Sequence, residues 1–179
     1  MLRIETGIFK NRVLEMVPDK RTRYTPNKVR MALVSSLDVK NKIILDLCAG
    51  SGIVGFEFLS NGAKEVHFVE TSPKAIKTIK ENAKKLNVEN KIKLFKVDAR
   101  IFLRTSLIKY DIVFTDPPFG LGILNEIVVK LDKIISEEGI IVIEHSKRET
   151  LNIPDNLKIV KSKKFGEIII DFLKLKNIP

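Results

Sequence analysis

The stretch that decides the fold is residues 45–55, Leu-Asp-Leu-Cys-Ala-Gly-Ser-Gly-Ile-Val-Gly. The apolar run that leads into it, residues 43–45, is short enough for a buried parallel strand, and apolar residues at helical spacing follow it as far as Asn61-Gly62. A strand, a glycine turn and a helix in this order are typical of a nucleotide-binding loop. The glycines permit positive φ and a close approach of backbone to ligand, and the helix N-terminus offers unpaired N–H groups.

The residues around this loop indicate which ligand it binds. Gly50 to Gly55 satisfies the G-x-G-x-x-G pattern, so a dinucleotide site is one alternative. Asp46 lies four residues before the first glycine, where a carboxylate would repel a pyrophosphate but would attract an ammonium group. The amino-acid end of S-adenosylmethionine carries such a group. Glu70 ends the next apolar run and is placed to bind ribose hydroxyls, which both kinds of cofactor possess.

Strands and helices alternate from residue 42 onward, which predicts a parallel sheet covered by helices on both faces. We expect strands near residues 42–47, 65–70, 91–97, 110–115 and 139–144. We expect helices near residues 52–60, 73–87, 99–106 and 122–137, the last of them ending at Gly139. Two further segments, 157–162 and 167–173, have no helix between them and predict a terminal antiparallel pair.

The N-terminal region has a different pattern. Residues 2–16 predict a short hairpin, and Thr25-Pro26 predicts a helix that begins with Thr25 as its N-cap. We therefore expect two parts, an α/β domain of residues 25–179 and a hairpin extension of residues 1–24, whose basic cluster of Lys20, Arg21 and Arg23 predicts contact with RNA.

Acidic residues end four successive predicted strands: Asp46, Glu70, Asp98 and Asp116. Ligands of open α/β sheets bind beyond the carboxyl ends of the strands, so these acids predict one shared site. Asp98 is expected near the adenine amino group of the cofactor, or as the N-cap of the next helix, or as both. The predicted cofactor-binding residues are Asp46, Cys48, Ala49, Gly50, Ser51, Gly52, Glu70, Thr71, Asp98 and Ala99.

The segment Asp116-Pro117-Pro118-Phe119 follows the apolar run of residues 112–115. Here the sequence resembles the amino-methyltransferases, whose D/N-P-P-Y/F/W motif holds an exocyclic amine beside the methyl donor. The resemblance implies that Asp116 and the Pro117 carbonyl accept hydrogen bonds from the amine, that the two prolines stiffen the turn, and that Phe119 stacks on a flipped base. The alternative is an ordinary proline turn with a core phenylalanine.

Composition and charge predict a globular protein with a polyanionic partner. The chain has 179 residues, one cysteine, two histidines and a net charge of +10, so we expect a cytoplasmic protein without a disulfide or a metal site. Residues 1–30 carry eight Lys and Arg against three Asp and Glu. A lysine-rich surface without a partner is the alternative. The predicted RNA-contacting residues are Arg3, Lys10, Arg12, Arg21, Arg23 and Arg30.

Several segments together resemble the RsmD-type methyltransferases of bacterial 16S ribosomal RNA. They are Arg3-Ile4 to Gly7, residues 23–30, Leu45 to Gly52, Val69-Glu70, Asp116 to Phe119, Glu144-His145 and Lys164 to Glu167. Tyr24 and Asn27 replace the proline and aspartate usual in the family, and Phe119 replaces the commoner tyrosine.

The resemblance implies a Rossmann-like class I fold dependent on S-adenosylmethionine, with a mostly parallel sheet of seven strands, the last antiparallel, and an N-terminal β-hairpin. It also implies methylation of a guanine N2 amine, with 16S rRNA or the small ribosomal subunit as partner; we expect a monomer and no membrane partner. The glycine turn and the two-proline turn are expected to face each other across one crevice.

Four other functions remain open. The D-P-P-[YF] motif also occurs in DNA adenine methyltransferases, although no target-recognition domain is visible in a chain of this length. Methylation of another RNA is a close alternative, and a non-catalytic RNA-binding module is a third. A dehydrogenase is expected only if NAD binds in place of S-adenosylmethionine.

Overall fold

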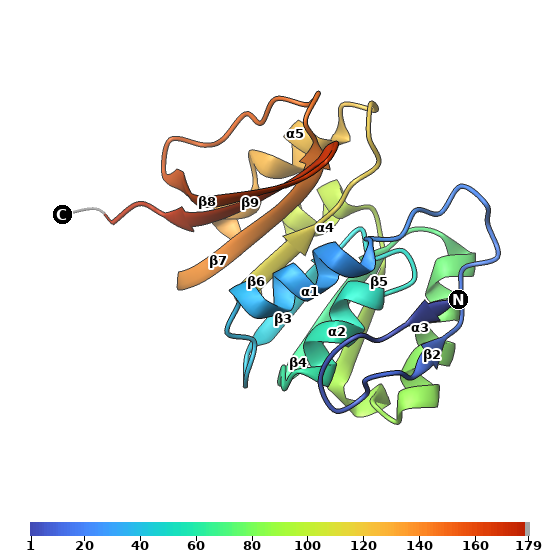
Figure 1. The fold of residues 1–179 in the computed structure, drawn as a ribbon. Helices are drawn as coiled ribbons and strands as arrows, with labels where there is room; N and C mark the ends of the chain where they lie inside the picture. The colour runs from blue at the N-terminus through green and yellow to red at the C-terminus, as the bar shows by residue number, and fades with distance from the viewer. Residues whose placement is uncertain (178–179) are drawn as a thin grey trace. The chain divides into compact units, whose positions relative to one another are not determined.

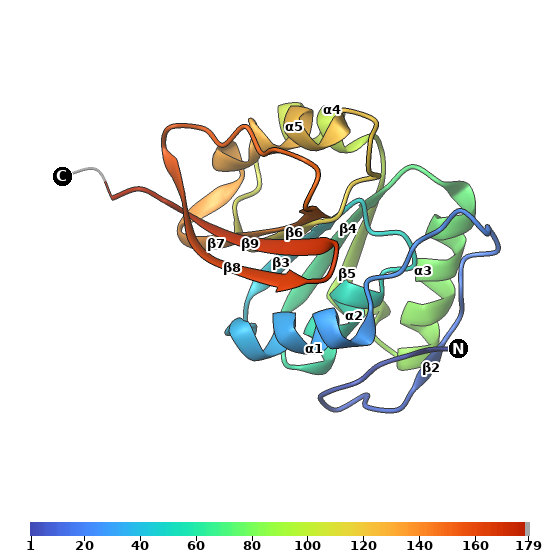
Figure 2. The ribbon, with the colours of Figure 1, turned by 45° about the horizontal axis from the view of Figure 1, so that its top comes forward.

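The computed structural model describes residues 1–177 and is shown in Figures 1 and 2. Within these residues, seven strands form a mostly parallel sheet in the order β5-β4-β3-β6-β7-β9-β8, and a separate hairpin pairs β1 with β2. The α/β class, the seven-stranded sheet, its antiparallel end and the N-terminal hairpin are therefore confirmed. The chain divides into two compact units, Met1–Val97 and a second that begins at Asp98.

The first unit contains the hairpin, three parallel strands and their helices. Its elements are β1 (Leu2–Arg3), β2 (Val13–Leu14), α1 (Asn27–Ser36), β3 (Ile43–Leu47), α2 (Ile53–Ser60), β4 (Glu65–Glu70), α3 (Pro73–Leu86), a 3₁₀ turn (Glu89–Lys91) and β5 (Ile92–Lys96). Strand β4 pairs with β3 on one side and β5 on the other, both in parallel. The hydrophobic core follows these strands, because Ile44, Leu45, Val66 and Phe68 are fully buried.

Helix α2 is the most deeply buried helix of this unit, since every residue from Ile53 to Ser60 is buried. A helix that is apolar on all sides is stable only when other elements surround it, and α2 contacts α1, β3 and β4. Gly55 permits the close approach to β4: a Cβ added there would lie 2.3 Å from Phe68 Cε1. The sequence after the glycine turn therefore forms a central helix, with one charged side chain, Glu57, inside it.

The second unit begins at the helix after β5. Its elements are α4 (Ala99–Thr105), β6 (Tyr110–Thr115), α5 (Ile123–Val128), a 3₁₀ turn (Leu131–Lys133), β7 (Ile135–Ser146), β8 (Leu157–Phe165) and β9 (Ile168–Leu175). Strand β9 lies between β7 and β8 and is antiparallel to both, with Val142 opposite Phe172 and Lys164 opposite Ile169. Strand β8 is the edge strand and exposes most of its side chains.

Two sequence predictions were wrong in detail. The helix predicted over residues 122–137 ends at Val128, because the apolar residues after it pair with β6: Tyr110 lies opposite Ile135, and Gly139 is inside β7. Thr25 does not cap α1, which begins at Asn27 without a side-chain cap. Its carbonyl oxygen instead accepts a hydrogen bond from Arg30, 2.7 Å away.

Candidate functional site

The glycine turn between β3 and α2 has an unusual backbone. Cys48, Gly50 and Gly52 all have positive φ, at 65°, 57° and 78°. The amides of Cys48 and Ala49 both donate to the Val69 carbonyl of β4, at 3.0 and 3.1 Å. These bonds fix the turn to the neighbouring strand. The surface over Gly50 is open, because the nearest atom to a Cβ added there would be Thr22 Cγ2 at 4.0 Å.

Glu70, at the end of β4, connects this turn with the start of α3. One carboxylate oxygen accepts a hydrogen bond from the Gly50 amide at 2.7 Å, and the other accepts from Thr71 and Ser72 at 2.8 and 3.0 Å. Ser72 in turn caps α3, because its hydroxyl accepts a hydrogen bond from the Ala75 amide. Glu70 thus places a partly exposed carboxylate beside the open surface of the glycine turn.

Asp46 lies beneath the turn and not on its surface. It is 1% exposed, and its carboxylate accepts a hydrogen bond of 3.1 Å from the Gly55 amide in the first turn of α2. Burial raises the pKa of Asp46 to about 8; the Gly55 hydrogen bond opposes this increase and the nearby charge of Glu70 adds to it. A cationic ligand beside this carboxyl group would favour its ionised form.

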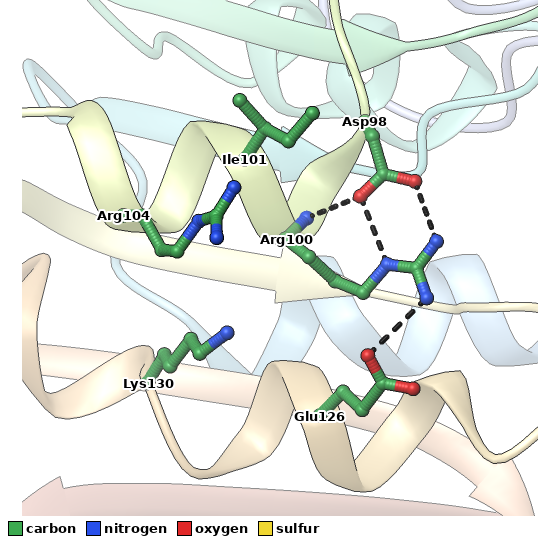
Figure 3. A pocket seen from close by; sticks show the side chains of 6 residues that line it. All are labelled: Asp98, Arg100, Ile101, Arg104, Glu126 and Lys130. Carbon is green, nitrogen blue, oxygen red and sulfur yellow. Dashed lines mark hydrogen bonds and ion pairs between the residues drawn. The ribbon is translucent and has the colours of Figure 1, made fainter.

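Asp98, in the second unit, is the N-cap of α4, and its carboxylate accepts a bond of 2.8 Å from the Arg100 amide. Figure 3 shows that the Arg100 guanidinium also binds both Asp98 oxygens, at 3.0 and 2.9 Å, and reaches Glu126 at 3.2 Å. These hydrogen bonds from Arg100 lower the pKa of Asp98 to about 2. An adenine amine at Asp98 would therefore share a carboxylate that Arg100 already binds.

A shallow surface depression of about 340 Å³ adjoins this ion-pair network. It is lined by Asp98, Arg100, Ile101, Arg104, Glu126 and Lys130, on α4, α5 and their ends. Figure 3 shows Arg104 and Lys130 on the side away from the Asp98 carboxylate. No sequence pattern indicates a role for Glu126, and the only local signal for Arg100 is its position two residues after the N-cap Asp98.

The two-proline turn follows β6. Asp116 and Phe119 are partly buried, Pro117 is buried and Pro118 is exposed. The Gly120 amide after the turn donates to Glu149 at 3.3 Å, and the other oxygen of Glu149 accepts from the Ser146 amide at the end of β7. Glu149 therefore connects the turn with β7, a role that no sequence pattern had indicated.

Glu144 and His145, which also end β7, are buried. His145 Nε2 lies 2.7 Å from Asp171 of β9. Burial opposes protonation of this histidine, but the hydrogen bonds to Asp171 and to the Ser146 carbonyl outweigh it and raise the pKa of His145. The pair joins β7 to β9, so His145 has a structural role in the sheet.

The basic residues predicted to contact RNA divide into two groups. Arg3, Lys10, Arg12, Arg21 and Arg23 are exposed. Arg30 is not available to a phosphate, because it is 1% exposed and lies 3.3 Å from the equally buried Glu57 carboxylate. It also donates to the carbonyl oxygens of Thr25 and Arg3. Arg30 therefore attaches the N-terminal extension to α2, and its prediction as an RNA contact was wrong.

Neither a membrane span nor a metal site was found in the described part of the chain. No helix within residues 1–177 combines the length and the apolar character that crossing a bilayer requires. Over the same residues, His, Cys, Asp and Glu side chains do not gather in groups of three that could bind a metal ion.

The chain has the Rossmann-like methyltransferase fold. This fold is defined by the strand order of the sheet together with a glycine turn after β3, an acid at the end of β4 and an Asp-Pro-Pro-Phe turn after β6. The chain belongs to the RsmD family, whose model, described as "Conserved hypothetical protein 95", matches residues 2–174.

Two relatives and one solved structure show how closely the chain resembles known proteins. It is 31% identical to Ribosomal RNA small subunit methyltransferase D of Buchnera aphidicola, over 92% of this chain and 88% of the relative. It is 28% identical to the protein of the same name from Escherichia coli, over 93% and 86%. The solved structure of yhhF from Escherichia coli superposes with a TM-score of 0.89 at 26% identity and covers 99% of both chains.

Proposed function

We propose that this protein transfers a methyl group from S-adenosylmethionine to the exocyclic N2 amine of a guanine in small-subunit ribosomal RNA. The observation that carries the proposal is the Asp116-Pro117-Pro118-Phe119 turn at the end of β6, in a chain of the RsmD family. The relatives named as small-subunit rRNA methyltransferases support ribosomal RNA as the substrate class. Guanine N2 is the finer part of the proposal and needs its own test.

Two features of the glycine turn support binding of the cofactor there. Gly50 has no side chain over its open surface, and the partly exposed Glu70 carboxylate beside it is an acceptor for ribose hydroxyls. Asp46 beneath the turn supplies negative charge toward the ammonium group of the cofactor once it is ionised. When bound, S-adenosylmethionine supplies an electrophilic methyl group on a sulfonium centre. Asp98 and Ala99 at the start of α4 are assigned to the adenine end.

The residues of the two-proline turn act on the base. The lone pair of a guanine N2 amine is delocalised into the ring, so the amine is a poor nucleophile until its N–H groups are held. Asp116 and the Pro117 carbonyl are acceptors for those N–H groups, and they stabilise the positive charge that develops on nitrogen. Phe119 provides a stacking face for a flipped base. The prolines restrict the backbone, so the acceptors are positioned before the substrate arrives.

Replacing Asp116 with alanine tests this assignment. We expect single-turnover methyl transfer to fall by at least about 100-fold, since removal of one preorganised electrostatic group typically has an effect of this size. The Kd for S-adenosylmethionine, measured by calorimetry, should stay within a few fold. Asp155→Ala, an exposed acid of the same unit, is the matched control and should leave both quantities unchanged. If Asp116→Ala instead abolishes cofactor binding, its proposed role is wrong.

The substrate is tested separately with the wild-type protein. Methyl transfer to small ribosomal subunits, naked 16S rRNA and duplex DNA is compared, and the product nucleoside is identified by mass spectrometry. N2-methylguanosine from either ribosomal substrate supports the proposal. N6-methyladenine in DNA would favour the alternative enzyme, and a failure to bind S-adenosylmethionine would favour a non-catalytic RNA-binding module.

A further inference from the structure

The exposed face of α3 consists mainly of lysines. Its members are Lys74, Lys77, Lys80, Lys84 and Lys85, which we call the α3 lysine face. The opposite face of the helix packs into the core of the first unit through Ala75, Ile79, Ala83 and Leu86. Figures 1 and 2 show α3 as a long helix on the outside of this unit.

The stability of the helix does not explain this lysine face. Lys74 is in the first turn, which has no acidic residue, and a cation there opposes the helix dipole. Lys80 follows Lys77 by three residues and precedes Lys84 by four, and like charges at these spacings repel. Glu81 is the only acidic residue on α3, and its 3.8 Å contact with Lys77 joins two exposed side chains. Only Lys84 and Lys85 suit the C-terminal end of the dipole.

The N-terminal extension lies along this same helix. Glu15 and Asn82 exchange two hydrogen bonds, at 2.7 and 3.1 Å, between the backbone of one and the amide side chain of the other. Arg12 donates to the Lys85 carbonyl at 2.9 Å, so its guanidinium is attached at the C-terminal end of α3. Both views show β2 beside α3 (Figures 1 and 2). Arg12 of the extension therefore adjoins the α3 lysine face at Lys85, whose ammonium group also pairs with Glu15 at 3.0 Å.

The distribution of charge favours a polyanionic partner for this unit in particular. Residues 1–97 contain 19 Lys and Arg against 10 Asp and Glu, a net charge of +9. Residues 98–179 contain 13 against 12, a net charge of +1. A general excess of lysine for solubility would raise the net charge of both segments. The positive charge is instead concentrated in the unit that carries α3 and the extension.

We propose that the α3 lysine face, together with the N-terminal extension, binds the phosphate backbone of the RNA substrate. The proposal rests on the proposed function, which supplies ribosomal RNA as the polyanion. Lysine is a flexible point charge suited to phosphates, and contacts of this kind position the RNA without recognising its sequence. The two-proline turn would then act on one base of an RNA whose backbone α3 binds.

The test replaces three of these lysines in the full-length protein. The variant Lys77→Gln/Lys80→Gln/Lys84→Gln removes three charges from α3 and leaves Lys85 and its neighbours intact. The matched control, Lys158→Gln/Lys163→Gln/Lys164→Gln, removes three charges from the edge strand β8. Both variants have the same net charge, and thermal melts should show that both are folded.

Binding to a 16S rRNA fragment is measured at several salt concentrations. We expect the α3 variant to bind at least about 10-fold more weakly at 0.1 M salt, and the slope of log K against log salt to become shallower by about two to three. The β8 control should stay within about threefold of wild type, with the wild-type slope. The Kd for S-adenosylmethionine should not change in either variant.

The outcomes separate the two proposals. If the wild-type protein methylates rRNA but the α3 variant binds it with wild-type affinity and salt slope, the α3 proposal is wrong and the proposed function stands. Equal weakening by both variants would show that net charge matters and position does not, which also overturns the α3 proposal. If the wild-type protein neither binds nor methylates rRNA, the proposed function itself fails.

Discussion

Removing the buried carboxylate of Glu57 should strongly destabilise the protein. Glu57 and Arg30 are each 1% exposed and form an ion pair at 3.3 Å. Glu57 also accepts hydrogen bonds from the Glu5 amide at 2.7 Å and the Thr6 hydroxyl at 3.1 Å. The Glu57→Ala substitution would leave the buried guanidinium with only the partly exposed Glu5 carboxylate, 3.6 Å away, and two N-terminal donors without their acceptor.

The size of the effect follows from the burial of both charges. Breaking a buried ion pair by removing one partner typically destabilises a protein by about 3–5 kcal/mol, because the remaining charge stays desolvated. A chain of 150–250 residues loses roughly 2–4 °C of Tm per kcal/mol. We therefore expect the Tm of Glu57→Ala to fall by about 6–20 °C.

The measurement is chemical and thermal denaturation followed by circular dichroism. Glu81→Ala is the matched control, because Glu81 forms an exposed pair with Lys77 and should change stability by less than about 0.5 kcal/mol. The double variant Arg30→Met/Glu57→Leu removes both charges and should be more stable than Glu57→Ala alone. A Glu57→Ala variant no less stable than the Glu81→Ala control would refute the reasoning.

Two further predictions concern the glycine turn and the extension. The folded-state pKa of Asp46, about 8, is above its unfolded value of 3.8, so wild-type stability should fall as the pH rises from about 4 to about 8. The fall should be on the order of 4 kcal/mol relative to Asp46→Asn, whose side-chain oxygen still accepts the hydrogen bond from Gly55. Denaturation of both proteins across this pH range tests the prediction, and a difference in stability that does not change with pH would contradict it. In Gly7→Ala, the added Cβ would lie 2.0 Å from the Ser60 carbonyl oxygen, at a φ of +78°, and this oxygen accepts the hydrogen bond from the Ile8 amide. Hydrogen exchange at Ile8 should therefore accelerate while the sheet amides keep their protection, and unchanged exchange at Ile8 would contradict the prediction.

Local patterns predicted the elements around the glycine turn well. The strand that ends at Leu47, the turn with positive φ and the helix that ends at Ser60 lie within a residue of their expected positions. The N-cap at Ser72 was also visible in the sequence, because a serine before a proline at the first helical position is a local signal. By contrast, the helix expected over 122–137 had a helical apolar pattern that β-sheet pairing overrode from Ile135 onward.

Charge was the least predictable property, because sequence shows how many charges a segment has but not which of them face solvent. Arg30 and Arg23 look alike in a basic segment, yet one is buried against Glu57 and the other is exposed. The lysines of α3 are spread over 12 residues, and the sequence analysis predicted no role for them. The folded helix places them on one face, and the N-terminal extension lies beside that helix.

The sequence by itself determined the order of strands and helices along the chain and the residue types of the glycine and two-proline turns, because local structure depends on neighbours within a few positions. It also determined the family, through these motifs and their order. Only the tertiary structure decided that Asp46 is buried with a raised pKa, that Arg100 binds Asp98, and that Arg30 is a structural residue. Those properties depend on burial and on partners distant in the chain. Burial sets the free energy of a charge, and the fold decides which charges are buried.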